Sequence, residues 1–290
     1  MSTESVQTGP HPRRTYHTAH GDLVFGGRCL IMGVLNVTPD SFSDRGAYLD
    51  PAAAVERTLA MAADGADVID IGAESTRPGA KPVSEQRQIE RAIPVLTQAR
   101  GCSLSLPISI DTRSARVARA ALDAGADMIN DVSAARHDPQ MPRLLAECKA
   151  PFVIMHMQGT PETMQAAPHY EDVVVEVATF FEQRADALSA LGVDVSTRML
   201  IDPGIGFGKT LEHNLALLRA AADYGRRWPV VLGPSRKRFL GEILDETDPG
   251  NRIFGTAAVV AHAALAGIAM VRVHDVKAMR QVVDVCDRLK

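Results

Sequence analysis

The stretch DGADVIDIGA, residues 64–73, contains the unit that decides the fold. A glycine after the last turn of a helix is typical of a helix C-terminus, and the aliphatic run that follows is typical of a buried strand. The same phrase returns as AGADMIND at residues 124–131. Two helix ends that lead through Gly-Ala-Asp into an apolar strand indicate a chain in which helices alternate with parallel strands.

Eight aliphatic runs of this kind are spaced along the chain and are predicted strands: 29–37, 67–73, 107–111, 128–132, 152–156, 199–204, 230–235 and 269–275. Helix starts are marked between them, with Ser84 and Thr210 as predicted N-caps and Asp50-Pro51 as a predicted N-cap and first helical residue. We therefore expect an α/β protein with a parallel sheet covered by helices. The number of strands favours a single (β/α)8 TIM barrel, and an open or seven-stranded sheet is the alternative.

Composition limits the class of protein. The chain has 290 residues, 46% of them hydrophobic and 4% aromatic, which predicts a sizeable aliphatic core. Its net charge is −4, so no general attraction to nucleic acid or to an anionic membrane is expected. No linker interrupts the pattern after residue 20. We expect a flexible N-terminal lead-in over 1–20 and one domain over 21–290.

Targeting and redox signals are weak. The polar N-terminus shows no apolar run of a secretion signal, and the apolar stretch 255–271 is better explained by a helix that ends at Gly267 and leads into a strand than by a membrane span. The four cysteines form no CxxC pair, and we expect reduced, buried thiols in a cytoplasmic protein. They are Cys29, Cys102, Cys148 and Cys286.

Polar residues stand where nearly every predicted strand ends, and in a barrel these ends converge on the face that carries active sites. They are Asn36, Asp70, Glu74, Asp111, Asn130, Asp131, His156, Asp202, Ser235, Lys237, Arg272 and His274. Any one of them can equally be a cap or a turn residue. Together, Asp111 and Asp202 offer hydrogen-bond acceptors and Asn130 offers both a donor and an acceptor. This set suits an amino-pyrimidinone edge, because a carboxylate can accept paired N–H groups.

Cations come from other strand ends. Arg77, Arg236, Lys237 and His274 accompany Arg272, which lies between two valines and therefore needs a partner for its charge. Acceptors on one wall and cations on another fit a polar ring joined to a phosphorylated tail.

Two loops complete the pattern. The segment 36–46 is long for a connection between a strand and a helix, which is typical of a mobile lid, and Asn36 is an oxygen ligand of the kind that Mg²⁺ accepts. The segment DPGIGFGKT, 202–210, lacks the spacing of a phosphate loop, and we interpret it as a tight turn that positions Asp202. His156 fits a core hydrogen bond and a substrate contact equally well.

These motifs resemble the dihydropteroate synthases. The resemblance runs in order over residues 28–285 and rests on GVLNVTPDSFSD (33–44), ESTRPGA (74–80), SIDT (109–112), INDV (129–132), MHMQGTP (155–161), DPGIGFGK (202–209), PSRK (234–237) and RVHDV (272–276). It implies a (β/α)8 barrel that condenses 6-hydroxymethyl-7,8-dihydropterin diphosphate with 4-aminobenzoate in folate biosynthesis and releases pyrophosphate. Sulfonamides mimic the second substrate in this family.

The resemblance also implies roles for individual residues. The pterin positions are Thr76, Asp111, Asn130, Asp202, Lys237 and Arg272. Those for pyrophosphate are Asn36, Arg272 and His274, with Asn36 as the Mg²⁺ ligand. Those for aminobenzoate are Phe42, Pro78 and Ser235. The expected catalytic set is Asn36, Asp44, Arg77, Lys237, Arg272 and His274. Ala134 and Ala135 stand where glycines are common in the family.

Two other functions stay open at this stage. A pterin-binding methyltransferase domain that acts on methyltetrahydrofolate shares the barrel and the pterin acceptors, although it does not need the ESTRPG and SRK motifs. A catalytically silent relative could keep every contact and act as a binding protein. The family also implies a homodimer, for which the aliphatic C-terminal helices offer contact surfaces.

Overall fold

Eight parallel strands form the centre of the protein in a computed structural model that describes residues 11–38, 51–75, 82–160 and 163–290. In chain order they are β3 (Leu30–Asn36), β4 (Val68–Gly72), β5 (Ile108–Asp111), β6 (Met128–Asp131), β7 (Phe152–Met155), β8 (Met199–Asp202), β9 (Val231–Leu232) and β10 (Met270–Val273). Each lies within a predicted run, so the eight predicted strands are confirmed.

The sheet closes on itself. Its strand order is β8-β7-β6-β5-β4-β3-β10-β9, and the two end strands meet through a parallel bridge between Ile201 and Val230. The Ile201 N–H also donates to the Pro229 carbonyl at 3.0 Å. The (β/α)8 barrel is therefore confirmed, and the open-sheet alternative is wrong.

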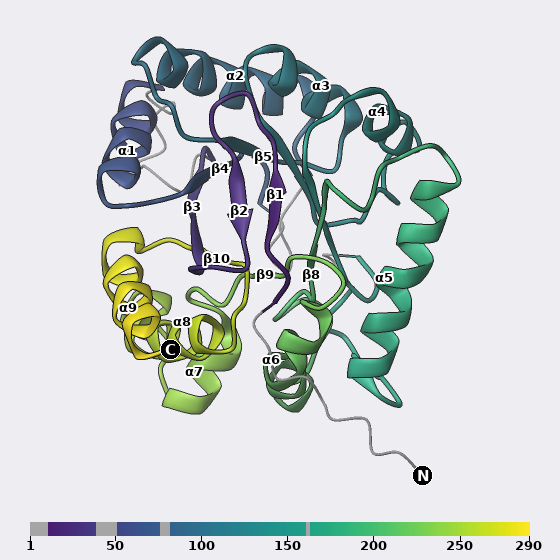
Figure 1. The fold of residues 1–290 in the computed structure, drawn as a ribbon, viewed down its shortest axis with the longest axis vertical. Coiled ribbons are helices and arrows are strands. Elements are labelled where there is room, and N and C mark those ends of the chain that lie inside the picture. Colours follow the sequence, from purple (N-terminus) through teal and green to yellow (C-terminus); the bar gives the residue numbers. More distant parts are fainter. Residues whose placement is uncertain (1–10, 39–50, 76–81, 161–162) are drawn as a thin grey trace.

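Helices surround the barrel as an outer ring (Figure 1). They are α1 (Pro51–Ala63), α2 (Glu85–Gly101), α3 (Ala115–Asp123), α4 (Met141–Glu147), α5 (Val173–Ser189), α6 (Leu211–Tyr224), α7 (Arg238–Leu244), the 3-10 turn η2 (Pro249–Arg252), α8 (Ile253–Leu265) and α9 (Val276–Leu289). The Ser84 side chain accepts from the Arg87 N–H, and the Thr210 side chain accepts from the His213 N–H, so both predicted N-caps are confirmed. Asp50 lies outside the described residues.

The repeated Gly-Ala-Asp phrase has a structural explanation. Gly65 and Gly125 have φ of +96° and +102°, a conformation that a side chain would strain. The aspartates that follow them each accept from the N–H of a neighbouring strand residue, Asp67 from Ile31 at 2.8 Å and Asp127 from Ile108 at 2.9 Å. The phrase therefore ends a helix and pins the start of the next strand.

A short hairpin precedes the barrel and corrects one prediction. Strands β1 (Arg14–Tyr16) and β2 (Leu23–Phe25) pair antiparallel, and Figure 1 shows them in front of the barrel strands, at the centre of the ring of helices. Tyr16 and Phe25 are buried in edge-to-face contact. They belong to one cluster with residues from the N-terminal parts of the barrel strands, among them Met32 and Val153. The flexible lead-in expected over residues 1–20 is therefore wrong from residue 14 onward, because the hairpin closes the N-terminal end of the barrel.

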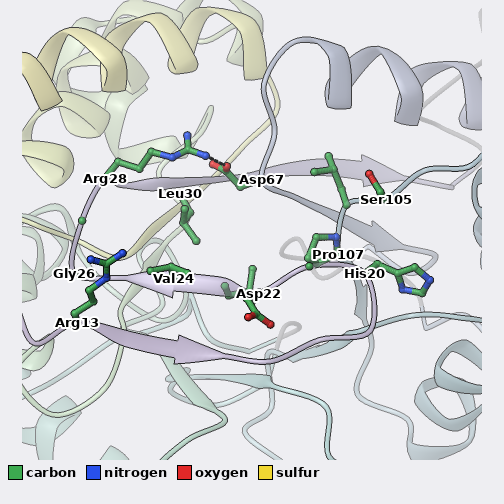
Figure 2. A pocket seen from close by; sticks show the side chains of 14 residues that line it. Arg13, His20, Asp22, Val24, Gly26, Arg28, Leu30, Asp67, Ser105 and Pro107 are labelled. Carbon is green, nitrogen blue, oxygen red and sulfur yellow. Dashed lines mark hydrogen bonds and ion pairs between the residues drawn. The ribbon is translucent and has the colours of Figure 1, made fainter.

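A pocket of about 520 Å³ lies beside this hairpin. Figure 2 shows Arg28 joined to Asp67 on one side of it, with Asp22 and Pro107 further along. Arg28, Asp67 and Pro107 lie at the N-terminal ends of barrel strands, whereas the polar strand ends lie at the opposite, C-terminal end. The pocket is therefore separate from the candidate active site.

The cysteines need a partial correction. All four are free; Cys29 and Cys286 are buried, Cys148 is half-buried and Cys102 is exposed, so burial of every thiol was a wrong expectation. The apolar stretch 255–271 forms most of α8 and leads through Gly267, at φ +78°, into β10, as predicted. Within the described ranges, no helix combines the length and apolarity that a membrane crossing requires.

Candidate active site

Three of the expected residues lie in one row across the C-terminal end of the barrel. The register pairs Asn36 with Gly72, Gly72 with Asp111, and Asp111 with Asn130. A Cβ atom placed on Gly72 would lie 3.5 Å from the Asp111 Cβ and 3.6 Å from the Asn36 Oδ1. Gly72 thus leaves the row open between Asn36 and Asp111, and the two side chains share one space.

Asp202 is held at the end of β8 by the turn that the sequence predicts. Its Oδ1 accepts from the Gly204 N–H at 2.7 Å, and Gly204, Gly206 and Gly208 all have positive φ. A Cβ on Gly204 would lie 1.9 Å from the His156 carbonyl oxygen, so glycine is required there. Burial raises the pKa of Asp202, while the Gly204 N–H and the nearby Lys237 act against that rise.

Arg272 finds the partners that its position demands. Its Nε donates to Asp70 Oδ2 at 2.6 Å and its Nη2 donates to Asp111 Oδ2 at 2.8 Å. Burial raises the pKa of Asp111 to about 7, and the Arg272 charge opposes this rise. Burial alone would lower the pKa of Arg272, but Asp70 and Asp111 outweigh it and raise that pKa. The guanidinium and the two carboxylates therefore depend on one another.

Ser235 and His274 meet at the ends of β9 and β10. The Ser235 Oγ lies 3.0 Å from the His274 Nδ1 and accepts from the His274 N–H at 3.2 Å. The Lys237 Nζ lies 4.0 Å from the centroid of the Phe207 ring, in the turn after β8. Six strand ends and the turn after β8 thus bring acceptors and cations together at one end of the barrel.

Other polar strand ends serve local structure. Glu74 accepts from the Arg113 Nη2 at 3.0 Å and from the Val83 N–H at 2.9 Å. Asp131 accepts from Ser133 and from the Ala135 N–H, and Arg236 pairs with Asp275 at 2.7 Å. Glu74 and Arg236 are thus held in ion pairs, and Asp131 caps the turn that follows β6.

Five expected site residues cannot be placed. Phe42, Asp44, Thr76, Arg77 and Pro78 lie outside the described residues, so their roles stay predictions.

Two residues beside the site received no role from the sequence, although Asp70 was among the polar residues at the strand ends. Asp70 is fully buried and contacts both Arg272 and Asn130, whose Nδ2 donates to Asp70 Oδ2 at 3.0 Å. Lys209 is buried behind the Asp202 turn, with its Nζ 3.0 Å from the His156 Nδ1 and 3.0 Å from the Phe207 carbonyl oxygen. His156 therefore makes a core contact. A charged residue inside an apolar run was the available signal for Asp70.

The donor set fits a metal ion that the substrate itself would carry. Across the described part of the chain, no group of three or more His, Cys, Asp or Glu side chains could hold a metal ion. Asn36 supplies one amide oxygen close to the Asp111 carboxylate. A single protein oxygen suits Mg²⁺ when phosphate oxygens and water complete its shell.

Comparisons with known proteins agree with this geometry. The family model described as "Pterin binding enzyme" matches residues 32–274. A dihydropteroate synthase from Synechocystis sp. is 46% identical over 266 residues, which cover 91% of each chain. The structure of Yersinia pestis dihydropteroate synthase with a sulfonamide drug superposes with a TM-score of 0.89 at 36% identity and covers 95% of this chain and 98% of that one. The Xanthomonas albilineans enzyme in complex with 7,8-dihydropteroate gives a TM-score of 0.84 at 39% identity, covering 96% and 98%.

Proposed function

The chain belongs to the pterin-binding enzyme family, and from that premise we propose that it condenses 6-hydroxymethyl-7,8-dihydropterin diphosphate with 4-aminobenzoate. It is a transferase of folate biosynthesis that forms dihydropteroate and releases pyrophosphate. The observation that carries this proposal is the row of Asn36, Asp111 and Asn130, completed by Asp202 and facing Arg272 and Lys237. Acceptors for a ring and cations for a diphosphate occupy one end of one barrel.

The acceptors bind the ring. Asp111, Asn130 and Asp202 offer oxygen atoms to the N–H groups of the amino-pyrimidinone edge. Lys237, which lies over Phe207, contacts the ring edge, and Arg272 covers its face. Buried carboxylates bind such donors strongly because little water competes for them.

The cations assist the leaving group. An aromatic amine is neutral and nucleophilic at neutral pH, so the principal barrier is cleavage of the C–O bond to the diphosphate. Arg272 and His274 stabilise the negative charge that develops on the pyrophosphate, and the ring carboxylates stabilise the positive charge that develops on the pterin. In this proposal Asp44 faces that cation, Thr76 contacts the pterin and Arg77 belongs to the catalytic set.

The aminobenzoate binds beside these groups. Ser235 lies at the end of β9, next to His274, and Phe42 and Pro78 complete the proposed pocket from the two loops. The amine then lies within reach of the methylene carbon from which pyrophosphate departs.

Asn36 would hold Mg²⁺ together with the diphosphate oxygens. The ion, when bound, neutralises charge on the departing pyrophosphate. We expect pyrophosphate to bind more tightly with Mg²⁺ than without it in the wild type. The variant N36A should lose most of that difference, as measured by calorimetry.

A coupled assay for pyrophosphate tests the reaction. Release from the pterin diphosphate that depends on 4-aminobenzoate supports the synthase activity. A methyltransferase domain and a silent relative would both release none. Absence of that dependence would therefore overturn the proposal.

We also propose a homodimer built on the C-terminal helices. Phe254 and Leu265 of α8 are 84% and 51% exposed, and Val285 and Leu289 of α9 are exposed beside them. An apolar surface of this kind is typical of an interface. Sedimentation should give a dimer for the wild type and a monomer for F254E; a monomeric wild type would refute the proposal. A cytoplasmic location stays a prediction.

A further inference from the structure

Asp70 links two groups that the proposed function places on the pterin and the pyrophosphate. It lies in the interior of β4 and is fully buried, and its Oδ2 accepts from the Asn130 Nδ2 at 3.0 Å and from the Arg272 Nε at 2.6 Å. Among the described residues its other oxygen, Oδ1, is buried without a hydrogen-bond partner. Asp70 therefore binds one residue of the acceptor set, Asn130, and one of the cations, Arg272, while its Oδ1 has no hydrogen bond.

The first consequence concerns the orientation of Asn130. A carboxylate paired with arginine can only accept hydrogen bonds, so the group that Asn130 turns toward Asp70 must be its amide nitrogen. The Asn130 Oδ1 is then the atom left to accept from a ligand. Asp70 thereby makes Asn130 an acceptor, like Asp111 and Asp202, and the three residues select a ring edge that presents N–H groups.

The second consequence concerns Arg272. Its guanidinium bridges Asp70 and Asp111 and contacts the Oδ2 atom of each. A ring that donates two N–H groups to Asp111 as a paired contact uses both of its oxygens and competes with the arginine for Oδ2. The unused Asp70 Oδ1 then offers a second acceptor on the same carboxylate, and paired contacts of this kind are favourable for arginine.

We propose that Asp70 is a positioning residue with two roles. It fixes Asn130 as an acceptor, and it holds Arg272 when the pterin ring replaces the arginine at Asp111. This inference rests on the proposed function for the identity of the ring. Asp70 does not touch the substrate itself, and it acts through its two neighbours.

The test uses the ring without its diphosphate, 6-hydroxymethyl-7,8-dihydropterin, and measures its Kd by calorimetry. D70N removes the negative charge that holds Arg272, so the arginine stays on Asp111 and competes with the ring. The Kd should therefore rise about tenfold. N130D places two carboxylates side by side and should raise the Kd by a similar factor. The swapped pair D70N/N130D keeps the total charge and one bridging amide, so most of the affinity should return.

The matched control is D67N. Asp67 precedes the same strand at the opposite end of the barrel, where it pairs with Arg28 and accepts from the Ile31 N–H. Its loss should lower the stability of the fold and leave the Kd for the ring unchanged. Thermal unfolding of every variant separates a folding defect from a binding defect.

Recovery in the swapped pair, together with an unchanged Kd in D67N, supports the positioning role, because a merely structural aspartate would not be rescued by an exchange with Asn130. The role is overturned if D70N binds the ring as the wild type does, or if the losses in the swapped pair simply add. If D70N does not fold, N130D and the swapped pair still decide the question. A wild type that binds the ring but releases no pyrophosphate would refute the proposed function and leave this test intact.

Discussion

Replacement of Lys209 by methionine should change how the stability of the fold depends on pH. Lys209 is 4% exposed, and burial lowers the pKa of its ammonium from an ordinary 10.5 to about 7, with Asp202 acting against the change and Lys237 adding to it. A difference of that size corresponds to a cost of about 5 kcal/mol for a charged lysine at this position.

The sign follows from proton binding. Between pH 10.5 and pH 7 the unfolded chain carries a proton on Lys209 that the folded chain binds only at the lower end. The free energy of unfolding therefore falls as the pH falls through this window. From pH 9 to pH 7 the loss due to Lys209 is about 2 kcal/mol, and it is absent in Lys209→Met.

Urea unfolding at a series of pH values measures the effect. The quantity of interest is the free energy of unfolding of the wild type minus that of Lys209→Met, because titrations of other groups cancel in this difference. It should increase from pH 7 to pH 9. The same substitution at the exposed Lys149 is the matched control for loss of a lysine side chain. A flat difference for Lys209 would refute the claim that burial depresses its pKa.

Three other outcomes are expected. Asp202→Ala removes a ring acceptor and should cost on the order of 3 kcal/mol in kcat/KM; a loss of only a few-fold would contradict the pterin assignment. Tyr16→Ala empties the hairpin core and should lower the free energy of unfolding by about 3 kcal/mol with kcat nearly unchanged, as urea unfolding and turnover would show. Ala134 has φ of +56°, so its replacement by glycine should raise the free energy of unfolding by roughly 0.5 kcal/mol. The same change at Ala120 in α3 should lower the free energy of unfolding by about 1 kcal/mol. A decrease at both positions would refute backbone strain at Ala134.

The barrel and the row of site residues were predictable because parallel strands impose both. Each apolar run is long enough to define a strand, and the C-terminal ends of parallel strands must meet at one face. Asn36 and Asp111 each end a strand, and Asn130 lies one residue before the end of β6, so their convergence followed from the parallel strand arrangement. The N-caps Ser84 and Thr210 were equally local signals.

The hairpin and the buried charges were not predictable for physical reasons. Strands of three residues show too little alternation to be recognised, and the polar residues around Tyr16 conceal its burial. Lys209, in a glycine-rich turn, has the local sequence of an exposed residue, and only tertiary packing places it against His156. Asp70 pairs with Arg272, which is 202 residues away in the sequence. Local sequence patterns cannot predict a contact at that separation.

The proposed role of Asp70 couples recognition of the pterin ring to binding of the pyrophosphate. Burial raises the pKa of Asp111 to about 7, and the Arg272 charge acts against this rise and favours the ionised carboxylate. A ligand that draws Arg272 away must therefore supply N–H donors of its own, or the Asp111 carboxyl takes up a proton. A ring with the correct donor edge satisfies this condition, and it leaves the arginine on Asp70 with donors to offer to a phosphate. One guanidinium shared between two carboxylates thus makes the diphosphate contact depend on the identity of the ring.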